Sequence, residues 1–360
     1  MTLIASAKIT KDVPIFLPGE YVPVSVTIEN KNQNADSHIS WICLQLTLET
    51  LPGKGAKKAE HFIKRSKNIG EPHIICCDVT VQAGETKEFE DRLLIPNDIM
   101  LVSTLRGTYL KYEYNLAMAV QHQNHEVQVK SITFQLMNYP FEIPRKKCDT
   151  IEPQLFTEME EGNDENHFRE IVADLVDEFS FKPSGQTFKV DDPKGIISEI
   201  ILPKMNYKFG DVVCGKMIFP QKNGSYCIEY LVKLQAVERI KVGLGSLDSK
   251  EHIQTLKCDY GLCAAMSSVA FRLPLDIGNN MCVESELVSL TYRLHFEFVT
   301  SDTPPFEEKQ AGQAGVVGDL KVQTVEWNLP INVIGCSTQN AALFLPDIWS
   351  TNEIQISICE

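Results

Sequence analysis

The sequence predicts an all-β protein built from two tandem β-sandwich domains, with one short amphipathic helix in the segment that joins them. Three observations lead to this prediction. The stretch 289–301 alternates apolar and polar side chains with the period of a strand. Similar segments recur in both halves of the chain at a nearly constant offset. Residues 166–179 instead follow the period of a helix.

The stretch 289–301 gives the clearest strand pattern in the chain. Its apolar side chains fall at every second position, and they are Leu290, Tyr292, Leu294, Phe296 and Phe298. A strand places alternate residues on opposite faces, so this set faces a core and the polar set faces water or a partner. We therefore name Arg293, His295 and Glu297 as candidate partner-binding residues.

Residues 1–148 are expected to form the first sandwich. The alternating segments that predict its strands are 4–10, 22–28, 41–50, 73–81, 87–95, 109–120 and 127–136. The Phe-Leu-Pro-Gly-Glu segment at 16–20 predicts a turn, because proline fixes φ and glycine takes φ > 0. Short strands separated by turn signals are typical of β-sandwiches.

The segment 51–72 is predicted to be a loop, and it gathers basic residues in an acidic chain. These residues are Lys54, Lys57, Lys58, Lys64, Arg65 and Lys67. One interpretation is a solvated loop. The other is contact with an anionic membrane or an acidic partner. The candidate binding residues of this second interpretation are Lys57, Lys58, Lys64 and Arg65.

Residues 149–184 are expected to link the two sandwiches. The part 152–165 is acidic and poor in apolar residues, which predicts a flexible segment. Asn166 is the expected N-cap of a helix that follows it. The apolar residues that share one face of this helix are Phe168, Ile171, Val172, Leu175, Val176 and Phe179. The helix either packs on a sandwich or fits the groove of a partner.

Residues 185–336 are expected to form the second sandwich, because they repeat the pattern of the first. The segment 207–218 echoes 16–28, and other segments echo each other at an offset of roughly 180 to 190 residues. The tail, 337–360, predicts either an added edge strand or a disordered end. Its alternating apolar residues are Ile354, Ile356 and Ile358.

Composition limits the classes of function. The formal net charge is −14 over 360 residues, which argues against nucleic-acid binding because phosphate neutralisation requires a surplus of lysine and arginine. The chain has no apolar run long enough to span a membrane, and its first residues lack the apolar block of a signal peptide. We expect a protein of the cytosol. The eleven cysteines lack metal-ligand spacing and are expected to be small buried apolar residues.

Motifs of catalysis are missing from the sequence. It contains neither a phosphate-binding G-x-x-x-x-G-K-[ST] nor a G-x-S-x-G. A metal-dependent enzyme could use His295 and Glu297 together with His122 and His125, but no further ligand is identifiable. We expect no cofactor and no catalytic residue, and a tandem sandwich of this kind is most simply a binding module.

Several stretches resemble the Rgp family of arrestin-like proteins. The residues that carry the resemblance are 292–301, 327–331, 105–107, 110–114 and 207–215. The resemblance implies two arrestin-like (immunoglobulin-like) domains and a role in retrograde endosome-to-Golgi transport. Rgp proteins pair with a larger subunit, Ric, to form the nucleotide exchange factor for the Golgi Rab GTPase. It therefore implies a non-catalytic subunit, with Ric and the Rab as partners, that is cytoplasmic and peripheral at the Golgi membrane.

An arrestin-type cargo or trafficking adaptor, retromer-like or acting for a ubiquitin ligase, is the alternative function. Such adaptors commonly carry a Pro-Pro-x-Tyr peptide. The nearest match in this chain, Pro304-Pro305-Phe306-Glu307, does not fit that pattern. The sequence therefore favours the exchange-factor subunit.

Overall fold

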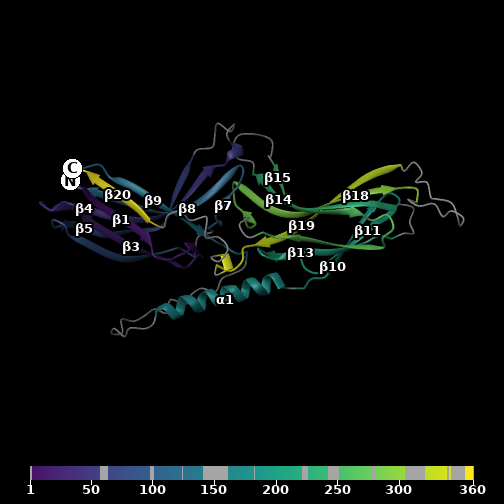
Figure 1. Ribbon diagram of the computed structural model, residues 1–360, viewed down its shortest axis with the longest axis horizontal. Coiled ribbons are helices and arrows are strands. Elements are labelled where there is room, and N and C mark those ends of the chain that lie inside the picture. Colours follow the sequence, from purple (N-terminus) through teal and green to yellow (C-terminus); the bar gives the residue numbers. More distant parts are fainter. Residues whose placement is uncertain are drawn as a thin grey trace. The chain divides into compact units, whose positions relative to one another are not determined.

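The fold is described from a computed structural model of the chain (Figure 1). The structure describes residues 2–56, 64–97, 101–123, 125–140, 161–181, 183–220, 226–241, 251–276, 280–304, 321–338, 340–341 and 353–359. The chain divides into two compact units. Unit 1 comprises Met1–Val172 and Ser337–Glu360, and unit 2 comprises Ala173–Cys336.

Unit 1 contains two sheets. Its strands are β1 (Thr2–Ile9), β2 (Ile15–Phe16), β3 (Tyr21–Asn30), β4 (Ser37–Pro52), β5 (Arg65–Val81), β6 (Thr86–Leu94), β7 (Leu105–Arg106), β8 (Leu110–His122), β9 (Gln128–Leu136) and β20 (Glu353–Cys359). The four-stranded sheet has the order β20-β1-β3-β6. The six-stranded sheet has the order β2-β9-β8-β4-β5, with β7 paired to β8.

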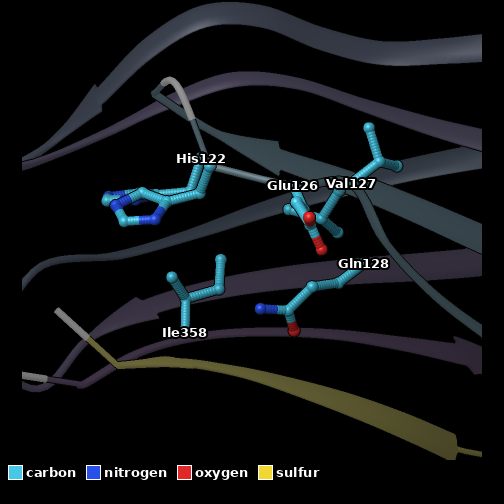
Figure 2. Close-up of a pocket in the computed structure, with 7 residues that line it drawn as sticks. His122, Glu126, Val127, Gln128 and Ile358 are labelled. Carbon is cyan, nitrogen blue, oxygen red and sulfur yellow. The ribbon is translucent and has the colours of Figure 1, made fainter.

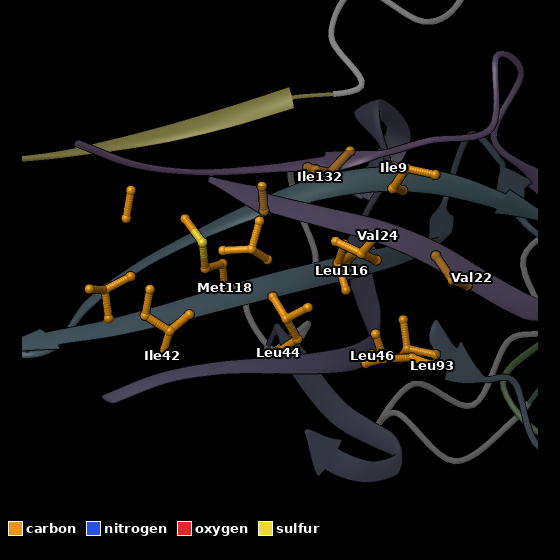
Figure 3. Packing of buried hydrophobic residues seen from close by; sticks show 14 of the residues in the cluster. Ile9, Val22, Val24, Ile42, Leu44, Leu46, Leu93, Leu116, Met118 and Ile132 are labelled. Atoms are coloured by element: carbon orange, nitrogen blue, oxygen red, sulfur yellow. The ribbon is translucent and has the colours of Figure 1, made fainter. Parts of the chain in front are cut away.

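The core of unit 1 is formed by the inward-facing residues of these strands. On β3 every second residue is buried, as the alternation predicts, and Val24 and Val26 are at most 2% exposed. Figure 3 shows Val24 and Leu116 in the same cluster, with side chains from both sheets around them. Full burial of one such side chain contributes about 1.5–3 kcal/mol.

Unit 2 also contains two sheets. Its strands are β10 (Gln186–Asp192), β11 (Gly195–Leu202), β12 (Asn206–Lys208), β13 (Val212–Ile218), β14 (Tyr226–Ile240), β15 (Glu251–Leu262), β16 (Ser268–Pro274), β17 (Val283–Glu284), β18 (Val288–Ser301) and β19 (Val322–Ile334). The four-stranded sheet has the order β10-β11-β13-β16. The six-stranded sheet has the order β12-β19-β18-β14-β15, with β17 paired to β18.

The two units repeat one strand order, which confirms the all-β sandwich architecture predicted from the sequence. Each strand of the first six-stranded sheet has a counterpart at the same place in the second. The repeat extends to side chains. The buried hydroxyl of Tyr114 on β8 donates a hydrogen bond to the carbonyl of Val102, and that of Tyr292 on β18 donates to the carbonyl of Asn280. In both cases the acceptor lies 12 residues before the tyrosine.

The predicted turn at 16–20 is formed, and it recurs in unit 2. Gly19 has φ +87° and Gly210 has φ +91°, a backbone conformation that glycine adopts without a steric cost. In both turns, the carboxylate that follows the glycine accepts a backbone hydrogen bond. The donor and acceptor pairs are Leu17 N to Glu20 Oε2 at 2.9 Å and Lys208 N to Asp211 Oδ2 at 3.1 Å.

The outer strand of the four-stranded sheet comes from a different part of the chain in each unit. In unit 2 it is β10, which directly precedes its partner β11. In unit 1 it is β20, which pairs antiparallel with β1. This pairing brings the two ends of the chain together (Figure 1). Ile356 is opposite Ala5, and both are fully buried. The edge strand that the tail predicts is therefore confirmed. Residues 342–352, before it, lie outside the described part of the chain.

The helix α1 (Glu161–Phe181) is longer than predicted. It begins five residues before Asn166, so the predicted N-cap is wrong and Asn166 lies inside the helix. The helix dipole is positive at the N-terminus, so acidic residues near that end stabilise a helix. The acidic composition that predicted a flexible segment is therefore equally compatible with the start of a helix. The predicted apolar face is confirmed: Val172 and Val176 are at most 1% exposed. No helix among the described residues is long and apolar enough to cross a membrane.

Contacts of α1 within each unit favour the packed alternative over a detached helix. In unit 1, the guanidinium of Arg169 donates to the buried carboxylate of Glu20, with 2.8 Å between Nε and Oε1. In unit 2, Lys208 pairs with Asp177, and the side-chain amide of Asn206 donates to the carbonyl of Phe179 at 3.3 Å.

The prediction that 51–72 is a loop is wrong over most of its described part. β4 continues to Pro52 and β5 begins at Arg65, and the two strands pair antiparallel in this region. A register shift and the positive φ of Gly70 accommodate the irregular pairing. This part of the edge strand contains mostly basic and polar side chains, so the sequence lacks the alternation of apolar and polar residues that predicts a strand. Lys57 and Lys58 lie outside the described residues.

Candidate partner-binding surface

The strand β18 holds the first set of candidate residues, and its inner face is packed as predicted. Phe296 and Phe298 are fully buried, and their rings stack with centroids 6.1 Å apart. Phe271, from the opposite sheet, meets Phe296 edge-on at 5.8 Å. These contacts fix the strand, so the outer face presents its polar side chains in a set position.

Glu297 and His295 form a hydrogen-bonded network on the outer face. The two are joined by 3.0 Å between Nε2 and Oε1, and Nδ1 of His295 lies 2.9 Å from Oδ1 of Asn328 on β19. Lys233 on β14 pairs with the carboxylate of Glu297. This pairing lowers the pKa of Glu297 below its ordinary value, and His295 adds to the effect while burial opposes it.

Arg293 is bonded to a second strand rather than to Glu297. Its Nε donates to Oε1 of Gln235 on β14 at 2.8 Å, and a guanidinium nitrogen lies 3.9 Å from the carboxylate of Glu251 on β15. Arg293 and Glu297, which lie on the same outer face, therefore pair with different residues. His295 is 8% exposed, so this part of the face is held together by its own side chains and offers little of the imidazole to a partner.

The two described basic candidates of unit 1, Lys64 and Arg65, lie at one end of its six-stranded sheet. Lys64 is exposed and pairs with Glu49 at 3.0 Å, and Arg65 is exposed at the start of β5. Strand pairing brings two further basic residues to this end, Arg106 on β7 and Lys111 on β8, which are opposite each other. Sequence reasoning missed both, because they lie some distance along the chain and strand pairing alone brings them here.

Two of the histidines considered as metal ligands, His122 and His125, lie in unit 1, whereas His295 lies in unit 2. The rings of His122 and His125 stack with centroids 5.5 Å apart, and they line a cavity of 310 Å³ (Figure 2). The other residues that line it include Glu126, Gln128 and Ile358. Among the described residues there is no group of three or more histidine, cysteine or acidic side chains placed to hold a metal ion.

The expectation that the cysteines are buried is wrong for some of the described ones. Cys227 and Cys263 are buried with 3.3 Å between their sulfur atoms, whereas Cys77 and Cys258 are exposed. Burial raises the pKa of the Cys336 thiol to about 11. A thiol with so high a pKa stays protonated at neutral pH and is a poor nucleophile.

The described part of the chain defines a protein of two β-sandwich units with a polar sheet face as its candidate site. No protein-family model matches the chain. The human protein named RAB6A-GEF complex partner protein 2 is 22% identical, over 92% of this chain and 95% of that protein. The protein of the same name from Bos taurus is 22% identical over 88% of this chain and 90% of its own length. This distant but extensive similarity supports the resemblance to the Rgp family.

Proposed function

We propose that this chain is the arrestin-like, non-catalytic subunit of a two-subunit guanine nucleotide exchange factor, which activates a Golgi Rab GTPase in retrograde endosome-to-Golgi transport. One observation carries the proposal. The similarity to proteins named RAB6A-GEF complex partner protein 2 runs through nine-tenths of this chain and of the human protein. The repeated sandwich agrees with an arrestin-like protein.

The role of such a subunit is binding rather than bond chemistry. An exchange factor acts by binding the nucleotide-free GTPase better than the nucleotide-bound form, and by linkage this weakens the hold of the GTPase on its nucleotide. The partners of the chain in this proposal are the larger Ric subunit and the Golgi Rab. Its location is the cytoplasm, peripheral at the Golgi membrane.

Reconstitution tests the proposal. The chain, the Ric subunit and the pair are purified, and release of labelled nucleotide from the Golgi Rab is measured with each. We expect the chain to co-purify with Ric, the pair to release nucleotide quickly, and the chain alone to have little effect. Full exchange by this chain alone would refute the division of labour. Failure of the chain to bind Ric would refute the proposal itself.

A further inference from the structure

An apolar patch lies on the outer face of the six-stranded sheet of unit 2. Tyr260 is 75% exposed, Leu262 is 66% exposed and Val322 is 56% exposed. Leu231 and Val299 lie beside them and are half-buried. We call the five residues Leu231, Tyr260, Leu262, Val299 and Val322 the β15 patch. Large apolar side chains that gather on one face mark interaction surfaces more often than scattered ones do.

Strand register shows that the patch is continuous over β15, β14, β18 and β19. Tyr260 on β15 is directly opposite Leu231 on β14. Glu229 on β14 is opposite Leu262 on one side and Val299 on the other, so these three residues form one row across the sheet. Side chains in the same or the next row of a sheet face are neighbours. A Cβ at Gly261 would lie 3.2 Å from the ring of the buried Tyr230, so residue 261 faces inward and its neighbours face outward.

Carboxylates stand among and beside the apolar residues of the patch. Glu229 lies between Leu262 and Val299, and Glu326 lies on β19. We call these two residues the acidic border, although one exposed cation, Lys321, also adjoins Val322. Glu229 and Glu326 are both exposed, whereas the neighbouring Glu297 is already paired with Lys233. Glu326 is directly opposite Glu297 on β18. Like charges in directly opposite positions destabilise a sheet, so a cation from a partner would be favourable here. The patch therefore fits an apolar surface that is flanked by lysine or arginine.

The counterpart edge strand in unit 1 is built differently. β5 exposes Ile74, but it also contains Pro72 and two residues with positive φ, Gly70 and Asp78. Its pairing with β4 has two register shifts, whereas β15 has one in its pairing with β14. Proline and bulges are features that keep other chains from an exposed edge. The edge strand of unit 1 is therefore irregular, whereas that of unit 2 is more regular and exposes Tyr260 and Leu262 near its end.

We propose that the β15 patch is the surface on which this chain docks its Ric subunit, through an apolar area of Ric bordered by basic residues. This proposal rests on the proposed function. The acidic border decides between occupants. A second copy that presents the same patch would bring carboxylates against carboxylates, and an anionic membrane would repel them.

The first experiment removes the apolar anchors. The double variant Tyr260→Asp, Leu262→Asp is compared with Ile74→Asp, which changes an equally exposed residue of β5. Both are purified, checked for unchanged melting temperature, and titrated with purified Ric subunit. We expect the double variant to lose at least about tenfold in affinity, as truncation of interface anchors does, and the control to bind like the unchanged protein.

The second experiment reverses the charge of the border. The variant Glu229→Lys, Glu326→Lys should weaken Ric binding, most strongly at low salt. Its matched control is Glu88→Lys, Glu90→Lys, two exposed carboxylates on β6 with the same change in net charge.

Each outcome decides one question. Normal Ric binding by both patch variants overturns the docking surface and leaves the proposed function standing. A patch variant that loses self-association or liposome binding, while it keeps Ric, overturns the choice of occupant. If the unchanged chain does not bind Ric at all, both the docking surface and the proposed function fail.

Discussion

At the scale of single residues, β18 packs one face into the core and forms polar bonds with the other. Replacing the fully buried Phe296 with alanine should cost about 3–5 kcal/mol, because it leaves a cavity among stacked rings. Arg293→Glu should cost less, about 1–2 kcal/mol, through the lost bond to Gln235 and the new repulsion from Glu251. Urea unfolding of the two variants checks this. Equal destabilisation would mean that both faces are packed as core.

The pH dependence of Glu297 gives a second test at this scale. Its pKa is lower in the folded protein than in the unfolded chain, chiefly because of Lys233, so the ionised carboxylate stabilises the fold. That contribution is present above the unfolded pKa of about 4.3, and it is lost as pH falls through the lower folded value. Glu297→Gln should therefore lower the melting temperature at neutral pH, and its difference from the unchanged protein should shrink below about pH 4. A difference that is constant from pH 7 to pH 3 would contradict the ionic origin.

At the scale of elements, β20 completes unit 1. The strand β1 would otherwise be an open edge, whereas its counterpart β11 is covered by the strand before it. Ile356→Ala should cost about 2–5 kcal/mol because the side chain is fully buried, while Ser357→Ala, at an exposed position, should change stability by less than about 0.5 kcal/mol. Thermal melts of both variants provide the measurement. Equal and small effects would show that the tail contributes no core.

Removing residues 353–359 extends the same argument to the whole strand. The unpaired backbone of β1 would become available to other chains, so we expect the truncated protein to associate at high concentration. Sedimentation at two protein concentrations tests this. A truncated protein that stays monomeric and melts like the full chain would contradict the role of β20.

At the scale of the whole molecule, a net charge of −14 makes the basic end of unit 1 unusual. Reversal of Lys57, Lys58, Lys64 and Arg65 should weaken binding to anionic liposomes, most clearly at low salt, because each basic residue near such a surface contributes about 1 kcal/mol. The control reverses four exposed lysines elsewhere, Lys8, Lys31, Lys189 and Lys216. Liposome flotation measures both. Equal loss in the two variants would show that net charge alone matters, and no loss in either would favour a solvated segment.

The sequence by itself determined most of the longer strands of unit 1, the repeat and the apolar face of the helix. Period-two alternation placed Phe296 in a core and Arg293 on the other face, because a strand leaves its side chains no other arrangement. The repeated Gly19 and Gly210 turns were visible for a similar local reason, since few residues other than glycine tolerate their φ.

Tertiary structure decided how distant segments pair. That Arg293 bonds to Gln235, that Arg106 and Lys111 join the basic end, and that Ile356 pairs with Ala5 all depend on strand register. Register is set by contacts between residues far apart in the chain, and local periodicity carries no information on them. The alternation in the tail could therefore predict an edge strand, but only the tertiary structure shows that this strand pairs with β1.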